Sequence, residues 1–98
     1  MPKLFHENLM ERFAHAVACL DRLLAQLSSR TPSATGFDTA RAAVEALPLN
    51  TEEVAAVRNR LNNARTYSDS GEQGAACYEL RLLARGLALI ESAVSGDR

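Results

Sequence analysis

The chain has 98 residues, a formal net charge of −1 and a pI near 6.1, with 47% hydrophobic and 23% charged residues. This length fits one domain, residues 1–98, and the balance of apolar and charged residues excludes the common disordered compositions. The near-neutral charge argues against a dedicated nucleic-acid-binding domain, which usually carries a basic excess.

The chain contains no apolar run that approaches the roughly 18 residues expected of a membrane-spanning helix. Lys3, His6 and Glu7 introduce charged and polar groups too early for the apolar region of a signal peptide. We therefore expect a cytoplasmic protein without membrane contact, and the abundance of Ala, Arg and Leu suggests a bacterial source. Cys19 and Cys77 lie within helical patterns and are expected to be buried free thiols.

Residues 4–29 are predicted to form the first helix, because apolar side chains recur at steps of three and four. The main stripe consists of Met10, Phe13, Val17, Leu20, Leu24 and Leu27, and it is widened by Leu9, Ala16 and Leu23. This register lasts under three heptads, and the flanking residues suit a helical bundle better than a two-helix coiled coil. The polar face is expected to hold Glu7, Glu11, His15, Arg22 and Gln26.

A loop is predicted from Thr31 to Gly36, because Pro32 disfavours helical backbone at the residue before it and Gly36 supplies turn chemistry. A short second helix follows, beginning at Thr35 or Asp38 and ending before Pro48. Its inward residues are expected to be Phe37, Ala40, Val44 and Leu47.

The third helix is predicted to begin at Asn50, with Glu53 as the second member of a capping box. Its inward face comprises Val54, Val57, Leu61 and Ala64, and its outer face comprises Arg58, Asn62 and Arg65. The helix is expected to end near Ser68–Gly71, and a second capping box, Ser70 with Gln73 or Asp69 with Glu72, to start the next helix.

The fourth helix, residues 76–94, has two apolar faces, whereas packing on one side needs an arc of only about 100°. One face carries Ala76, Leu80, Leu83, Leu87, Ile90 and Val94. The other, about 120° further round at 100° per residue, carries Ala75, Tyr78, Leu82, Gly86, Leu89 and Ala93. The first face is expected to hold the core, while the second either packs inside the bundle or forms an interface.

Together these patterns predict an all-α, single-domain four-helix bundle in which the third and fourth helices form an antiparallel hairpin. No segment alternates apolar and polar residues at period two, so no strand is expected.

The hairpin from Leu61 to Leu83 resembles one tetratricopeptide unit over about a quarter of the chain. Three characteristic positions and one large apolar position of that repeat are matched by Tyr67, Gly71, Ala76 and Leu80. Asn63 and Leu83 depart from the pattern, and the sequence holds no second copy, whereas repeat arrays normally need about three. The resemblance implies a helical hairpin with a tight turn.

Residues that could support chemistry do not gather into a recognisable motif. His6 and His15 do not share a helix face, so no metal site is predicted. Cys19 lies one turn from His15, but nucleophilic catalysis also needs an orienting group, which the pattern does not supply. We therefore expect neither an enzyme nor a cofactor-binding protein.

Two readings of function remain. The favoured one is a small protein–protein interaction module, such as an adaptor, a regulator or a secretion-type chaperone, acting as a homodimer through an apolar helix face. Its interface residues are Tyr78, Leu82 and Leu89, with Arg81 and Arg85 beside them. The alternative is a nucleic-acid-associated regulator that uses an arginine face, provided the hairpin aligns Arg58, Arg65, Arg81 and Arg85, with Arg60 beside them.

Overall fold

The computed structural model describes the backbone of residues 2–95 and the side chains of residues 9–94. This part of the chain forms four α-helices and no strand. The helices are α1 (Pro2–Ser28), α2 (Ala34–Glu45), α3 (Thr51–Asp69) and α4 (Gln73–Ser95). The predicted all-α class is therefore confirmed.

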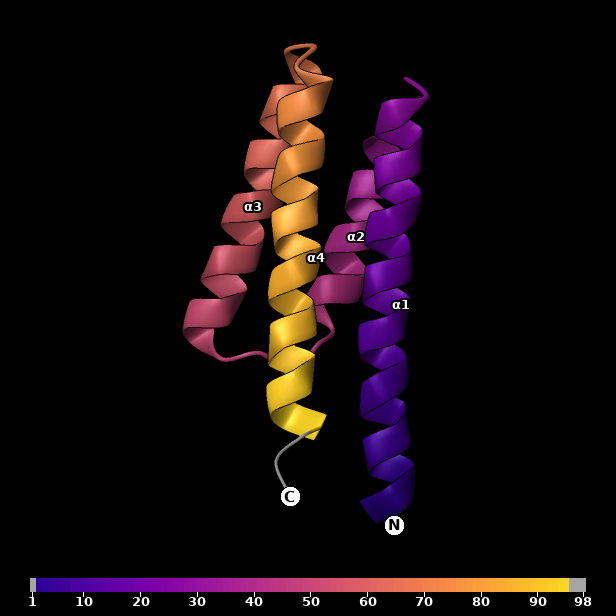
Figure 1. Cartoon of the computed structure of the whole chain (residues 1–98), viewed down its shortest axis with the longest axis vertical. Coiled ribbons are helices and arrows are strands. Elements are labelled where there is room, and N and C mark those ends of the chain that lie inside the picture. The colour runs from indigo at the N-terminus through magenta and orange to yellow at the C-terminus, as the bar shows by residue number, and fades with distance from the viewer. Residues whose placement is uncertain (1, 96–98) are drawn as a thin grey trace.

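Successive helices run in opposite directions, so the chain forms an up-down-up-down bundle (Figure 1). α4 lies between α1 and α3 in this view and packs against both, while α2 lies behind and packs against α1 and α3. The expected α3–α4 hairpin is confirmed, with α1 packed along it. Because α1 and α4 have 27 and 23 residues, they extend beyond the shorter α2 and α3 at one end of the bundle.

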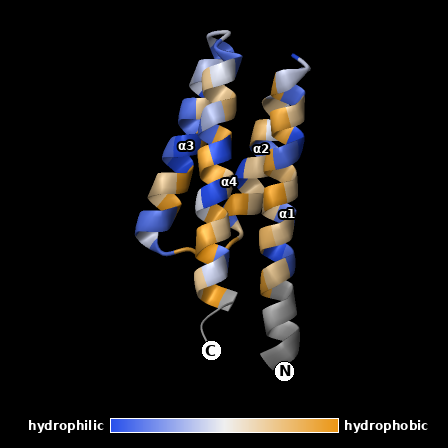
Figure 2. Ribbon diagram, in the orientation of Figure 1, coloured by the Kyte–Doolittle hydropathy of each residue, from blue (hydrophilic) through white to orange (hydrophobic). Residues whose placement is uncertain are grey.

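One hydrophobic core joins all four helices. The largest side chains that are almost completely buried are Phe13, Leu20, Leu23, Leu27, Val44, Leu80 and Leu87. Leucine, alanine and valine supply most of this core, as the low aromatic content of 5% requires. Figure 2 shows α3 as the most hydrophilic helix, in agreement with its narrow buried stripe of Val57, Leu61 and Ala64.

The buried face of α1 is centred differently from the predicted stripe. Its most buried residues are Leu9, Phe13, Ala16, Cys19, Leu20, Leu23 and Leu27. Met10, Val17 and Leu24, which were expected at the centre, are only half-buried at its edge. Small residues explain the difference, because Ala16 and Cys19 are buried, whereas a hydrophobicity pattern gives large side chains more weight.

The predicted second helix is confirmed, and all four of its expected inward residues, Phe37, Ala40, Val44 and Leu47, are buried. It begins earlier than expected, at Ala34, so Gly36 belongs to the helix rather than to the loop. A Cβ atom at Gly36 would lie 2.3 Å from Oε1 of Gln26 and 3.0 Å from a methyl carbon of Leu23. Gly36 is therefore a close-packing position between α1 and α2.

The start of α3 agrees with the prediction. The Asn50 side chain accepts a hydrogen bond from the Glu53 amide at 2.8 Å, and the Glu53 carboxylate accepts one from the Asn50 amide at 2.9 Å. This reciprocal pair satisfies two amide groups that have no partner within the helix.

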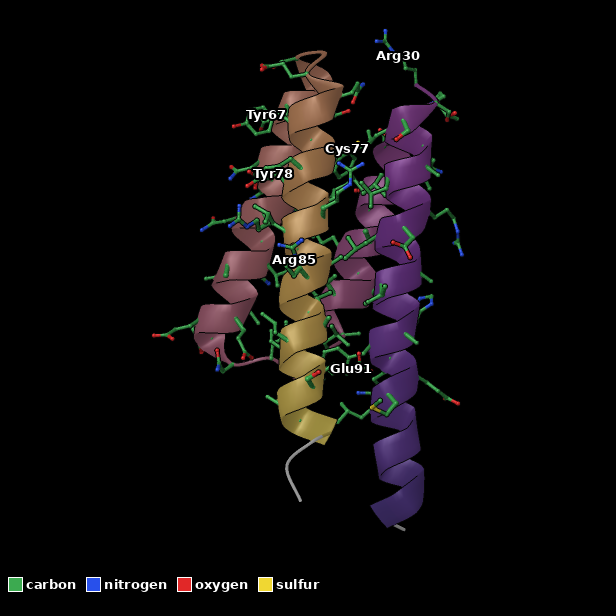
Figure 3. All side chains as sticks on the ribbon, in the orientation of Figure 1. Arg30, Tyr67, Cys77, Tyr78, Arg85 and Glu91 are labelled. Atoms are coloured by element: carbon green, nitrogen blue, oxygen red, sulfur yellow. The ribbon has the colours of Figure 1, made fainter. Side chains whose placement is uncertain are left out.

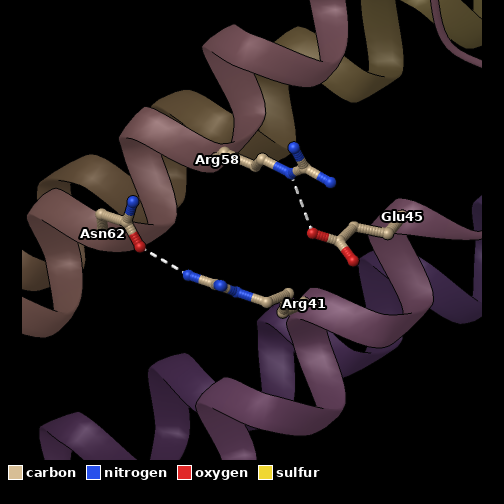
Figure 4. A network of polar contacts seen from close by, with 4 residues as sticks. All are labelled: Arg41, Glu45, Arg58 and Asn62. Atoms are coloured by element: carbon tan, nitrogen blue, oxygen red, sulfur yellow. Dashed lines mark hydrogen bonds and ion pairs between the residues drawn. The ribbon is translucent and has the colours of Figure 1, made fainter.

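The predicted outer face of α3 also contacts α2, through exposed polar pairs (Figure 4). Arg58 pairs with Glu45 at 3.0 Å, and Arg41 donates to the amide oxygen of Asn62. One turn further on, Arg65 pairs with Asp38 at 3.2 Å. A helix-period pattern separates apolar from polar faces, but it does not show that a polar face meets another polar face. Arg58 and Asn62 are exposed and Arg65 is half-exposed, so the predicted outer face of α3 is confirmed, and only its polar contacts with α2 were not predicted.

The predicted capping boxes between α3 and α4 are replaced by a backbone turn. Gly71 has a φ of +83°, its amide donates to Ser68, and the next amide, of Glu72, donates to Tyr67 at 2.8 Å. These two bonds define a Schellman motif, which closes a helix when the residue after the cap adopts left-handed backbone. The Ser70 amide already donates to α3 carbonyls, so it is not available to Gln73.

Candidate functional site

The outer face of α4 is an apolar strip on the surface of the bundle. Tyr78 and Leu89 are 59% and 68% exposed, and Leu82 is half-buried between them. α1 and α3 pack on the two flanks of α4, while α2 lies on the far side and leaves this strip uncovered. Isolated exposed leucines are common, but a row of large apolar side chains on one helix face is typical of an interaction surface.

The inner face of α4 holds this strip on a rigid support. Leu80, Leu83 and Leu87 are buried, as predicted for the core face. Ile90 is only half-buried and Val94 is 41% exposed, because the end of α4 extends beyond α3. The two predicted faces of α4 are thus distinct in the structure: one is core along most of its length, and the other faces solvent.

Arg81 and Arg85 border the strip on its α1 side. At about 100° per residue, Arg85 lies within roughly 20° of Tyr78, and Arg81 lies about 40° further round. Figure 3 shows Arg85 on the side of α4 that faces the viewer, whereas Cys77 lies between α4 and α1. Both arginines are exposed, and neither forms an ion pair within the described side chains.

All five residues of the predicted interface therefore share one face of α4. This arrangement differs from that of the arginines of α3, each of which has a carboxylate partner within the bundle. Arg60, for example, pairs with Glu79 of α4 at 3.0 Å.

The arginines do not form the single basic patch on which the alternative reading depends. Arg58 and Arg65 face α2 and pair with its carboxylates, and the Arg65 guanidinium also lies 5.8 Å from the centre of the Phe37 ring. Arg81 and Arg85 lie on the outer face of α4. The hairpin thus divides these side chains between two surfaces, because the two helices present different faces to their neighbours.

The residues considered for catalysis lie apart from the outer face of α4. The Cys19 thiol is 3.7 Å from Nε2 of His15, and the Cys77 thiol is 4.0 Å from the Ser28 hydroxyl. Both cysteines are buried and unbonded to each other, in agreement with the prediction of free thiols. His6 lies outside the side chains that the structure describes, so the prediction about the two histidines remains untested.

Gly86 is the residue of this region whose importance the sequence pattern did not reveal. The pattern placed Gly86 in the second apolar face of α4. In the structure, Gly86 leaves open space, because no neighbouring side chain or helix lies within 4 Å of the position a Cβ would take. A glycine inside a long helix costs about 1 kcal/mol relative to alanine, and that cost was the available signal. The missing side chain of Gly86 leaves an apolar groove between α3 and α4, next to Leu82 and Leu89.

None of the described helices combines the length and apolarity that crossing a membrane demands. No protein-family model, curated protein or solved structure matches the chain.

Proposed function

We propose that this protein is a small, non-enzymatic interaction module that binds a partner protein through the outer face of α4. The observation that carries the proposal is the row of Tyr78, Leu82 and Leu89, of which the first and last are more than half exposed. Burying such side chains removes apolar surface from water, which contributes about 25 cal/mol for each Å² before the entropic costs of association are subtracted. The buried residues on the inner face of α4 anchor the helix in the bundle, so its backbone needs little ordering on binding.

The proposal makes the protein an adaptor, a regulator or a secretion-type chaperone of a bacterial cytoplasm. It assigns no catalytic residue, cofactor or metal ligand. The predicted homodimer would use this same face, so a second copy is an alternative occupant of it, and self-association is measured separately because it changes the mass in solution.

The experiment compares the wild type with Leu89→Glu and with a control, Asn59→Glu. Asn59 is exposed on α3, with no charged residue three or four positions away, so it takes the same charge on a surface away from α4. Both variants are expected to retain the helical circular dichroism of the wild type. The proposal predicts that native partners crosslinked to the wild type and to Asn59→Glu are lost with Leu89→Glu.

Light scattering on the same three proteins shows whether a second copy occupies this face, in which case Leu89→Glu is expected to convert the homodimer to a monomer. The salt dependence of binding distinguishes this proposal from the nucleic-acid alternative. Binding through phosphate contacts weakens steeply with salt concentration, whereas an apolar face is nearly indifferent to it. Equal partner recovery from all three proteins would contradict the proposal.

A further inference from the structure

A groove between α3 and α4 adjoins the apolar strip. Its volume is about 140 Å³, and its apolar lining consists of Ala56, Val57, Leu83, Gly86, Leu87 and Ile90. Glu53 and Arg60 form its polar edge on α3. The groove is open because Gly86 has no side chain and Ala56 has a small one.

The groove matches the size of one apolar side chain. An engineered apolar cavity of roughly 150 Å³ binds benzene, so this volume suits a phenyl ring or a branched aliphatic group. Leu82 and Leu89 lie four residues before and three residues after Gly86, one helical turn to either side. A helix laid along α4 would therefore contact both leucines and direct one side chain between them.

The charges beside the groove and the strip indicate the chemistry of that helix. On the α3 side, Arg60 is already paired with Glu79. On the α1 side, Arg81 and Arg85 have no ion-pair partner within the described side chains. Among the described charged side chains of α4, they are also the exposed ones, whereas Glu79 and Glu91 are half-buried. Among the described side chains, the α1 flank of the strip thus carries unmatched positive charge, whereas the Glu53 carboxylate lies across the groove on α3 and accepts a hydrogen bond from the Asn50 amide.

Building on the proposed function, we propose that the groove at Gly86 takes one apolar anchor side chain of an acidic amphipathic helix from another protein. The helix packs on Leu82 and Leu89, and its carboxylates face Arg81 and Arg85. This is the helix-in-groove mode of recognition, in which an apolar face gives affinity and flanking charges give specificity. A second copy docked through its own strip fits less well, since that strip is flanked by the same two arginines.

The test uses two fluorescein-labelled synthetic peptides of about 18 residues, or five helical turns. Both carry the same row of leucines at helical spacing. The remaining positions are Glu and Gln in one peptide and Lys and Gln in the other. Binding to the full chain is followed by fluorescence anisotropy. The acidic peptide is expected to bind about tenfold more tightly than the basic one, and Arg81→Gln with Arg85→Gln is expected to remove about three- to tenfold of that affinity.

Filling the groove provides the second arm of the test. Gly86→Leu is expected to lower the affinity of the acidic peptide by about tenfold or more, because the leucine side chain fills the site of the anchor. Gly74→Leu is the matched control. It lies about 18 Å along the same helix, and a Cβ there also meets nothing within 4 Å. Both changes replace a helical glycine with a strong helix former, so neither is expected to unfold the chain.

The outcomes separate this inference from the proposed function. Equal binding of the two peptides, abolished by Leu89→Glu, would overturn the acidic partner and leave the docking face intact. If the acidic peptide binds tightly and Gly86→Leu does not change its affinity, then the groove is not the anchor site. A dimer in light scattering that Gly86→Leu converts to a monomer would identify a second copy as the occupant instead. Binding of neither peptide, together with unchanged native crosslinks for Leu89→Glu, would overturn both proposals.

Discussion

Arg30 and Gly71 occupy the same position in two copies of the same turn. Each follows the cap residue of its helix, α1 or α3, with a φ of +58° for Arg30 and +83° for Gly71. Arg30 donates to the Leu27 carbonyl and Thr31 donates to Gln26, which reproduces the bonding at the end of α3. Left-handed backbone suits glycine, whereas for other L-residues it costs about 1–2 kcal/mol. The end of α1 is therefore strained in a way that the end of α3 is not.

Relief of this strain is the first prediction. Arg30→Gly is expected to be more stable than Arg30→Ala by about 1 kcal/mol, since both variants lose the same charge and only one relieves the backbone. Gly71→Ala is expected to lose about 1 kcal/mol. Urea unfolding followed by circular dichroism measures all three variants. Equal stability of the two Arg30 variants would show that the turn is not strained.

The core face of α4 gives the second prediction. Leu83 is 4% exposed, so Leu83→Ala is expected to lower the free energy of unfolding by about 2–5 kcal/mol. Leu89→Ala is the matched control, because the same deletion on the exposed face of the same helix is expected to change stability by about 0.5 kcal/mol or less. If the two variants lose similar amounts in urea unfolding, then the inward face of α4 is misassigned.

The capping box of α3 gives the third prediction. Asn50→Ala removes the acceptor for the Glu53 amide and is expected to cost about 1 kcal/mol. Asn50→Asp keeps an acceptor and adds a negative charge at the positive end of the helix dipole, so it is expected to retain wild-type stability. Thermal unfolding of the two variants provides the measurement, and an alanine variant as stable as wild type would show that the cap is not stabilising.

The two cysteines give the fourth prediction. Cys19 and Cys77 are 3% and 6% exposed, so an alkylating reagent is expected to reach them slowly in the folded protein and rapidly in denaturant. Mass spectrometry after alkylation without reductant is expected to show two adducts on the unfolded chain. An unlabelled chain lighter by two hydrogens would instead indicate a disulfide.

The elements that the sequence predicted well are those in which large apolar residues repeat along one helix. Leu80, Leu83 and Leu87 defined the core face of α4 because three- and four-residue spacing places them together whatever the neighbours are. The Asn50–Glu53 cap was equally local, since both partners lie within one turn. Exposure of Tyr78 and Leu89 was left open in the sequence, because it depends on where α2 packs.

The features that the sequence did not predict depend on contacts between helices. Arg58 and Arg65 lie on the outer face of α3 as predicted, but their pairing with acidic residues of α2, far away in the sequence, was not predicted. Gly36 was expected in a loop, yet its role is to let α1 and α2 approach. The groove at Gly86 likewise depends on which side chains of α3 and α4 face each other, and the predicted hairpin does not define this.

The central claim is that the outer face of α4 is a docking surface, and site-specific photo-crosslinking tests it most directly. A benzophenone-bearing residue is placed at position 89 in one protein and at position 59 in the other, and both proteins are illuminated in their native cells. The claim predicts a discrete crosslinked product from position 89 that Gly86→Leu weakens, and none from position 59. No product from position 89, or the same products from both positions, would contradict it.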